Sequence, residues 1–275
     1  MRAKNNMENY HDFSVNLVRK AGMLLLEARR GVIEVSHKGQ DERDVVTKAD
    51  LEVSAFLTEE ILKAFPDHKV YSEEDAKAKE AQMSGFEWVL DPIDGTANFS
   101  RGIPHFAVCV GLLHDGVVIV GAVYNPVTNE LFSFEKERGV FLNGASIKTS
   151  SVTDPSQAQG IIVVGHKASL WDWGAAVYRE FLEHLKKLKA LGSSSLDICF
   201  LAAGRADVVL YGTLSTRDIA SAIGILRAAG GEIYTLSGEI ATLSTKPQPL
   251  IATNNRELFE KLQPYLHADL LPPLK

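Results

Sequence analysis

A short acidic and hydroxyl-bearing run, residues 91–96 (DPIDGT), offers ligands for a cation and a phosphate at the end of a predicted strand. The proline fixes the backbone angle after the first carboxylate, so Asp91 and Asp94 can bracket one small region of space with the carbonyl of Ile93. Mg²⁺ prefers such oxygen ligands together with phosphate oxygens. A helix that starts at Gly95-Thr96 would direct free N–H groups at a phosphate. The run therefore predicts a magnesium and phosphate site, although an Asx turn with a helix N-cap uses the same residue types.

Three further acidic positions could add ligands to this site. Residues 72–75 (SEED) follow a short predicted strand, residues 44–50 (DVVTKAD) lead into a predicted helix, and Asp218 begins an apolar helix. Each also has an ordinary structural explanation, as an exposed acidic loop or, for Asp50 and Asp218, as a helix cap. Several carboxylates that converge without cations would repel one another. A shared site would therefore need divalent metal ions.

The chemistry expected of such a site is hydrolysis of a phosphomonoester by metal-activated water. One metal ion would lower the pKa of a bound water, and a second would stabilise the leaving alkoxide. In-line transfer of the phosphoryl group needs no covalent enzyme intermediate. The chain has no GxSxG motif, and Cys109 and Cys199 both lie in apolar runs. We therefore expect no serine or cysteine nucleophile.

Composition argues against nucleic-acid and membrane partners. The 275 residues carry a formal net charge of −6, and the densest basic stretch, residues 186–189, is short. The longest apolar runs, 106–113 and 117–123, are too short to span a bilayer, and the first residues lack the apolar core of a signal peptide. Two cysteines in apolar runs indicate a reducing compartment. We expect a cytoplasmic protein.

The elements that position these residues change in character near residue 150. The first half has predicted helices at 9–29 and 47–65 and predicted strands at 70–71, 87–90, 106–114, 117–125, 130–135 and 138–142. In the second half, strands at 161–164, 188–191, 206–211 and 250–252 alternate with helices at 172–186, 196–203, 218–229 and 255–265. This pattern indicates an α+β half followed by an α/β half. We expect one compact unit, in which residues 1–148 carry most metal ligands and residues 149–275 complete the metal and substrate site.

The sequence resembles the inositol monophosphatase family of magnesium-dependent, lithium-sensitive phosphatases over nearly its whole length. Residues 44–50 are similar to the family's DxVTxxD, residues 72–74 to SEE, residues 88–99 (WVLDPIDGTANF) to WxxDPxDGTxxF, and residues 125–144 to NPxxxELF…FLNG. The resemblance implies a layered αβαβα sandwich of the inositol monophosphatase and fructose-1,6-bisphosphatase type. Its first half would hold an antiparallel sheet and its second half a smaller mixed sheet. The resemblance also implies a homodimer.

The resemblance further implies a role for each matching residue. The metal ligands would be Glu73, Asp91 and the carbonyl of Ile93 for a first Mg²⁺, Asp91, Asp94 and Asp218 for a second, and Glu73 with water for a weaker third. The catalytic residues would be Glu73, Thr96 and Asp44, of which Thr96 and Asp44 would hydrogen-bond and help to activate the attacking water. The substrate would contact Lys38, Gly95, Thr96, Gly192, Ser193, Ser194, Tyr211 and Arg217.

Two of these positions depart from the family's pattern. Arg217 stands where the family usually has tryptophan, and it could pair with a second substrate phosphate or carboxylate or extend to solvent. Tyr211 stands where inositol-specific members have a glutamate that contacts the ring hydroxyls. We expect a phosphorylated polyol or sugar as the substrate, with myo-inositol 1-phosphate first. Fructose 1,6-bisphosphate, histidinol phosphate and 3′-phosphoadenosine 5′-phosphate are the alternatives within this class, and a non-catalytic regulatory scaffold is the alternative outside it.

Overall fold

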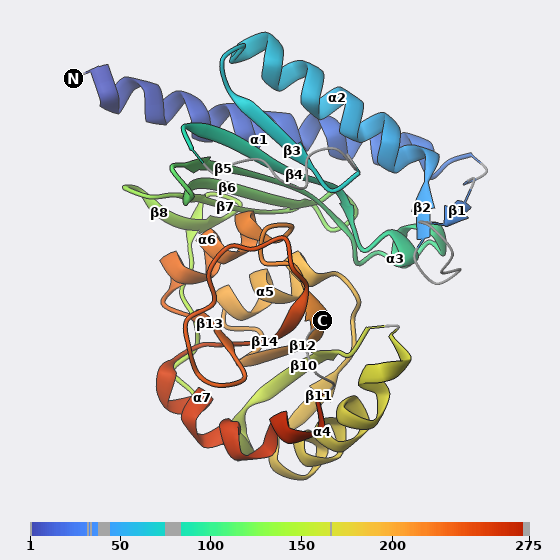
Figure 1. Ribbon diagram of the computed structural model, residues 1–275. Coiled ribbons are helices and arrows are strands. Elements are labelled where there is room, and N and C mark those ends of the chain that lie inside the picture. The colour runs from blue at the N-terminus through green and yellow to red at the C-terminus, as the bar shows by residue number, and fades with distance from the viewer. Residues whose placement is uncertain are drawn as a thin grey trace. The chain divides into compact units, whose positions relative to one another are not determined.

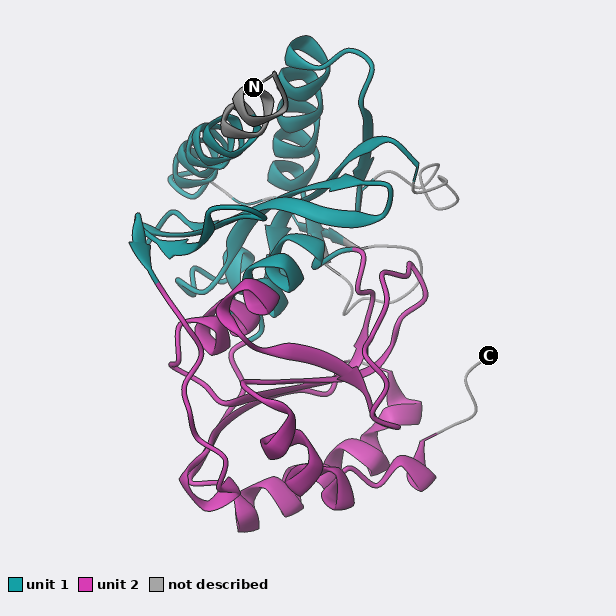
Figure 2. Ribbon diagram, turned by 90° about the vertical axis from the view of Figure 1, so that its left-hand side faces the viewer, with its two compact units in different colours: residues 1–146, 192–196, 218–225 teal, residues 147–191, 197–217, 226–275 magenta. Residues whose placement is uncertain are grey.

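The computed structural model describes residues 2–31, 33, 35–37, 45–74, 84–165 and 167–271 (Figure 1). The chain divides into two compact units (Figure 2). Unit 1 comprises residues 1–146, 192–196 and 218–225, and unit 2 comprises residues 147–191, 197–217 and 226–275. Two short segments of the second half therefore belong with the first half. None of the helices in the described ranges is long and apolar enough to cross a membrane.

Unit 1 is built on a seven-stranded sheet of order β3-β4-β5-β6-β7-β8-β9. Its strands are β3 (Lys69–Ser72), β4 (Phe86–Asp94), β5 (Ala107–His114), β6 (Val117–Asn125), β7 (Glu130–Glu135), β8 (Gly139–Leu142) and β9 (Ala145–Ser146). All neighbouring strands are antiparallel except β3 and β4, which are parallel. The predicted meander is confirmed. A separate antiparallel pair joins β1 (Val35–His37) to β2 (Val45–Thr47).

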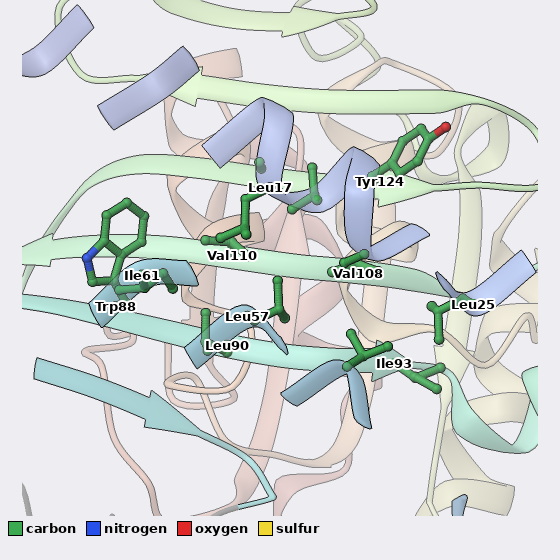
Figure 3. Close-up of a cluster of buried hydrophobic side chains, with 14 of the residues drawn as sticks. Leu17, Leu25, Leu57, Ile61, Trp88, Leu90, Ile93, Val108, Val110 and Tyr124 are labelled. Atoms are coloured by element: carbon green, nitrogen blue, oxygen red, sulfur yellow. The ribbon is translucent and has the colours of Figure 1, made fainter. Parts of the chain in front are cut away.

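Helices α1 (Arg2–Ala28) and α2 (Lys48–Ala64) pack against one face of this sheet (Figure 3). Helix α2 begins with a capping box between Thr47 and Asp50, and it ends immediately before Phe65 and Pro66, because proline cannot continue a helix. Fully buried Leu57 and Trp88 lie in the core between the helices and the sheet. Burying a side chain of this size contributes about 1.5–3 kcal/mol.

Alternation along the strands gives the sheet two distinct faces. Leu90 of β4, Val110 of β5 and Ala122 of β6 are in register and belong to the core beneath α1 and α2. We call this side the core face. Because successive side chains of a strand point to opposite sides, the residues between these positions lie on the other side, which we call the ligand face.

Unit 2 holds a mixed five-stranded sheet of order β11-β10-β12-β14-β13. The strands are β10 (Gln159–Val163), β11 (Lys187–Lys189), β12 (Val208–Leu214), β13 (Glu232–Thr235) and β14 (Gln248–Thr253). The helices of the second half are α4 (Trp171–His184), α5 (Ser194–Ala202), α6 (Ala220–Ala229) and α7 (Arg256–Leu262). Strand β13 was not predicted, because its four residues directly follow the glycine pair that ends α6. The core of this unit includes the aromatic residues Trp173, Phe181 and Phe259.

Candidate metal and phosphate site

Glu73 follows strand β3, and Asp91 lies beside it in the neighbouring parallel strand β4 of unit 1. The backbone N–H of Glu73 donates to the carbonyl oxygen of Leu90 at 3.2 Å, so β3 delivers its acidic end beside Asp91. Leu90 lies on the core face, and Asp91 therefore points to the ligand face. Asp91 is only 5% exposed, whereas Glu73 is exposed. The two residues thus lie at the same level of the sheet, with Asp91 buried and Glu73 exposed.

A bulge in β4 shapes the segment between Asp91 and Asp94. Asp91 pairs with Cys109 and Asp94 with Ala107, so three steps along β4 oppose two along β5. The N–H of Ile93 donates to Oδ1 of Asp91 at 3.1 Å, which folds the segment onto its first carboxylate. The carbonyl oxygen of Ile93 accepts from the Thr96 hydroxyl at 2.9 Å, and a carbonyl oxygen keeps a second lone pair for a cation.

Asp94 is fixed by donors at the start of α5. Its carboxylate accepts from the Ser193 hydroxyl at 2.6 Å, the Ser194 N–H at 3.0 Å and the Ser195 N–H at 2.7 Å. These bonds and the positive end of the helix dipole compensate the cost of burying the charge. Asp94 therefore joins the end of β4 to the start of α5 through these hydrogen bonds.

Asp218 reaches the same face of the sheet from far along the chain. The Tyr71 hydroxyl donates to Oδ1 of Asp218 at 3.1 Å. Tyr71 pairs with Val89, so both point to the ligand face, as does Asp91 two residues farther along β4. Asp218 itself lies in a turn just before α6, which starts two residues later than predicted. The tyrosine therefore ties this distant carboxylate to the face that carries Asp91.

Thr96 begins α3 (Thr96–Ser100) after Gly95, whose φ of 93° favours glycine. This confirms the predicted helix start. The Thr96 hydroxyl lies 3.1 Å from Oδ1 of Asp50 and 2.9 Å from the carbonyl oxygen of Ile93, and its single proton serves one acceptor at a time. The other oxygen of Asp50 accepts from the N–H and hydroxyl of Thr47 at 2.7 and 2.6 Å. Asp50 thus caps α2 and also contacts Thr96, a second role that sequence reasoning missed.

The remaining predicted site residues fall into three groups. Lys38 and Asp44 lie outside the described residues. Gly192, whose carbonyl oxygen accepts from Asn98 at 3.3 Å, lies in unit 1 with Ser193 and Ser194. Tyr211 and Arg217 lie in unit 2 and are 0% and 3% exposed, so the alternative in which Arg217 extends to solvent is wrong. Their contact with a substrate stays a prediction.

A different set of possible metal ligands lies on α4. The set consists of Glu180, Glu183 and His184, whose ligand atoms lie within 4.8 Å of one another. Among the described residues, this is the group of three possible ligands that meets that spacing. It includes none of the predicted ligands. Glu183 is 3.8 Å from Arg179, and Glu180 is 3.4 Å from His184, so side-chain ion pairs explain this set without a metal.

Comparison with known proteins gives one consistent result. The family model described as the inositol monophosphatase family matches residues 6–270. A fructose-1,6-bisphosphatase/inositol-1-monophosphatase of Thermotoga maritima is 32% identical over 235 residues, which cover 86% of this chain and 88% of that protein. An inositol monophosphatase of Mesembryanthemum crystallinum is 32% identical, over 96% of this chain and 100% of that protein. A Nus factor SuhB of Pasteurella multocida is 31% identical and covers 93% and 96%.

Solved structures show the same fold. A Thermotoga maritima IMPase superimposes with a TM-score of 0.84 at 29% identity, covering 95% of this chain and 98% of that one. A Staphylococcal IMPase-II with bound 2′AMP superimposes with a TM-score of 0.81 at 25% identity, covering 95% and 97%. The predicted fold class is therefore confirmed.

Proposed function

This chain belongs to the inositol monophosphatase family and is a phosphoric monoester hydrolase, and from this premise we propose that it uses Mg²⁺ to hydrolyse a small phosphorylated polyol or sugar. The observation that carries the proposal is the ligand face of unit 1. There Asp91 lies beside Glu73, the bulge leads to Asp94, and Tyr71 ties Asp218 to the same face. Oxygen donors of this kind fit Mg²⁺ better than a softer metal.

We propose the following division of the metal ligands. Glu73, Asp91 and the Ile93 carbonyl would hold one ion, and Asp91, Asp94 and Asp218 a second, with Glu73 available to a weaker third. When bound, Mg²⁺ would lower the pKa of a bound water molecule and stabilise the negative charge of the leaving alkoxide. The N–H groups of Gly95 and Thr96 are proposed to bind the phosphate.

Thr96 and Asp50 are proposed to orient the attacking water. When the Thr96 hydroxyl donates to Asp50, its oxygen lone pairs can accept a hydrogen bond from a water molecule. The Thr96–Asp44 pair expected from the sequence stays a prediction beside this role, because Asp44 lies outside the described residues. Glu73, close to Asp91 and exposed, is proposed to accept the proton that the water releases.

Inositol monophosphate is the first candidate substrate. The names of similar proteins support this choice, and the bisphosphatase name of the Thermotoga relative supports fructose 1,6-bisphosphate as the second. Tyr211 in place of a carboxylate favours testing substrates other than inositol. Because relatives of similar identity are named Nus factor SuhB, a regulatory role is a second candidate function.

A substrate panel tests this proposal most directly. Phosphate release would be measured for myo-inositol 1-phosphate, fructose 1,6-bisphosphate, histidinol phosphate and 3′-phosphoadenosine 5′-phosphate at fixed Mg²⁺, with a chelator-treated sample beside each. We expect release from at least one substrate and its loss on chelation. Release that survives chelation would overturn the metal proposal, and no release from any substrate would favour the regulatory role.

Three further properties belong to the same proposal. Family members commonly pair and respond to lithium, so we expect a cytoplasmic homodimer that lithium inhibits. Sedimentation velocity tests the dimer, and a lithium titration of phosphate release tests the inhibition.

A further inference from the structure

Two glycines in neighbouring strands lie directly beneath the first turn of α6. Gly111 of β5 and Gly121 of β6 are register partners on the ligand face. Ser221 of α6 lies over both of them, and these three residues all belong to unit 1 (Figure 2). A Cβ on Gly121 would be 2.7 Å from the Ser221 carbonyl oxygen, and a Cβ on Gly111 would be 3.2 Å from the Ser221 backbone nitrogen. We call this glycine pair the helix seat.

Close approach explains these glycines, and backbone conformation does not. Neither Gly111 nor Gly121 has a positive φ, so alanine could adopt the same backbone angles at both positions. The closest atoms that a Cβ would meet at either position belong to the backbone of Ser221, so no side-chain rotation relieves the contact. An alanine at Gly121 therefore requires α6 to move away from the sheet.

The helix seat lies in the same row of the sheet as the residue that holds Asp218. Tyr71, Val89, Gly111 and Gly121 are register partners across β3, β4, β5 and β6. The Tyr71 hydroxyl, at one end of this row, donates to Asp218, three residues before Ser221. Asp91 occupies the next row on the same face. The height of α6 above the sheet therefore sets the distance between Asp218 and Asp91.

We propose that Gly111 and Gly121 are positioning residues for the metal centre, because they hold α6 at the height at which Asp218 shares a cation with Asp91 and Asp94. This inference rests on the proposed function, since it assigns the helix seat an effect on metal affinity. Gly121→Ala should raise the Mg²⁺ concentration for half-maximal activity about tenfold or more, because mutation of groups that orient metal ligands typically costs about 10–100-fold in metal affinity. Gly111→Ala, with its longer contact, should have a smaller effect.

Gly224, one turn farther along α6, provides a matched control. Its Cβ would meet side-chain atoms of Phe134 and Val118, each at 2.9 Å, and side chains can adjust where backbone cannot. Gly224→Ala crowds the same helix–sheet contact without pressing on the backbone next to Asp218. It should lower the midpoint of urea unfolding while leaving the Mg²⁺ titration unchanged.

The experiment compares the full-length wild type with these three variants. Phosphate release would be titrated with Mg²⁺, calorimetry would measure binding of Mg²⁺ alone, and urea unfolding would report stability. A folded Gly121→Ala protein with the wild-type Mg²⁺ titration would overturn the helix seat, as would an equal shift in Gly224→Ala. If Gly121→Ala does not fold, the same criteria apply to Gly111→Ala, for which a shift of at least about twofold is expected.

Wild-type behaviour separates this inference from the proposed function. A wild type that binds Mg²⁺ but releases no phosphate contradicts the proposed hydrolysis, and calorimetry of the variants then decides the helix seat. A wild type that binds no Mg²⁺ overturns both. A wild type that needs Mg²⁺, with variants that need no more of it, overturns the helix seat alone.

Discussion

The two faces of the seven-stranded sheet both bury apolar side chains, but they differ at the level of Leu90 and Asp91. On the core face, β4 and β5 present large apolar side chains such as Leu90 and Val110 to the helices above them. On the ligand face, the same two strands present Asp91 and Gly111. Leu90 and Asp91 are neighbours in the chain, yet one lies in a hydrophobic core and the other at a polar site.

At this level of the sheet, one residue serves folding stability and its neighbour in the chain serves the proposed chemistry. Apolar burial on the core face supplies folding free energy, because each large side chain removed from water contributes independently of any ligand. The ligand face instead buries a carboxylate, which costs free energy unless hydrogen bonds or a metal compensate for it. Substitutions on the core face should therefore change unfolding, and substitutions on the ligand face should change turnover.

The largest expected effect is that of Asp91→Asn. The amide oxygen can still accept from Ile93, so the turn survives, but the negative charge shared by two proposed metal ions is lost. We expect phosphate release to fall by more than about 1000-fold, because metal ions contribute several kcal/mol to transition-state stabilisation. Asp115→Asn is the matched control, since Asp115 lies in an exposed turn and accepts from Gly85 at 2.8 Å. Turnover of Asp91→Asn near the wild-type value would contradict the proposed metal site.

Leu57→Ala tests the core face. Leu57 is 0% exposed, and its truncation should lower the free energy of unfolding by about 2–5 kcal/mol through lost burial and a residual cavity. Turnover per folded molecule should stay unchanged. Leu51→Ala in the same helix is the control, because Leu51 is 56% exposed. Urea unfolding and phosphate release measured on the same samples would show whether the two faces are energetically separate.

Thr96→Val removes the hydroxyl that contacts Asp50 but keeps the size of the side chain. We expect about a tenfold loss of turnover, because the proposed water loses one of its orienting groups. The capping of α2 should persist, since Thr47 still donates to Asp50. Thr96→Ser should keep most of the turnover. Equal turnover in the valine and serine variants would exclude a role for the hydroxyl.

The smallest expected effect concerns His68, at the edge of the core face. Its Nδ1 accepts from Nε1 of Trp88 at 3.0 Å, and its ring stacks between Phe65 and Phe86. Burial lowers the pKa of His68 below its ordinary value of 6.5, and the charge of Asp67 opposes this shift. The unfolded chain therefore binds a proton more readily than the folded one, so stability present above pH 6.5 is lost as the pH falls through the lower folded-state pKa.

Urea unfolding at about pH 7.5 and about pH 5.5 measures this dependence. The stability difference between the two conditions should shrink in His68→Gln. A His68→Gln protein with the wild-type pH dependence would show that other groups carry it.

Local patterns in the sequence predicted most of the elements and part of the site. The meander and α2 follow from alternation, turn residues and a proline stop, all of which act within a few residues. That Asp91 and Asp94 both stand at one end of β4 was also predictable, because the two residues are close in sequence and follow a predicted strand. Asp218 entered the prediction mainly through a family resemblance, since only tertiary packing brings it to Tyr71. The second role of Asp50 was hidden because the capping box already explained that residue.

Unit 1 is built from segments that lie far apart in the sequence, and this affects how the chain folds during synthesis. All strands of its sheet are complete by residue 146, whereas the residues that cover Gly111 and Gly121 are 218–225. Domains fold as their segments emerge from the ribosome. The sheet can therefore pair its strands before residues 218–225 are available to cover Gly111 and Gly121. A nascent chain that stops before Asp218 would carry residues 91–96 without the proposed metal ligand Asp218. On the proposed function, we expect such a fragment not to turn over a substrate.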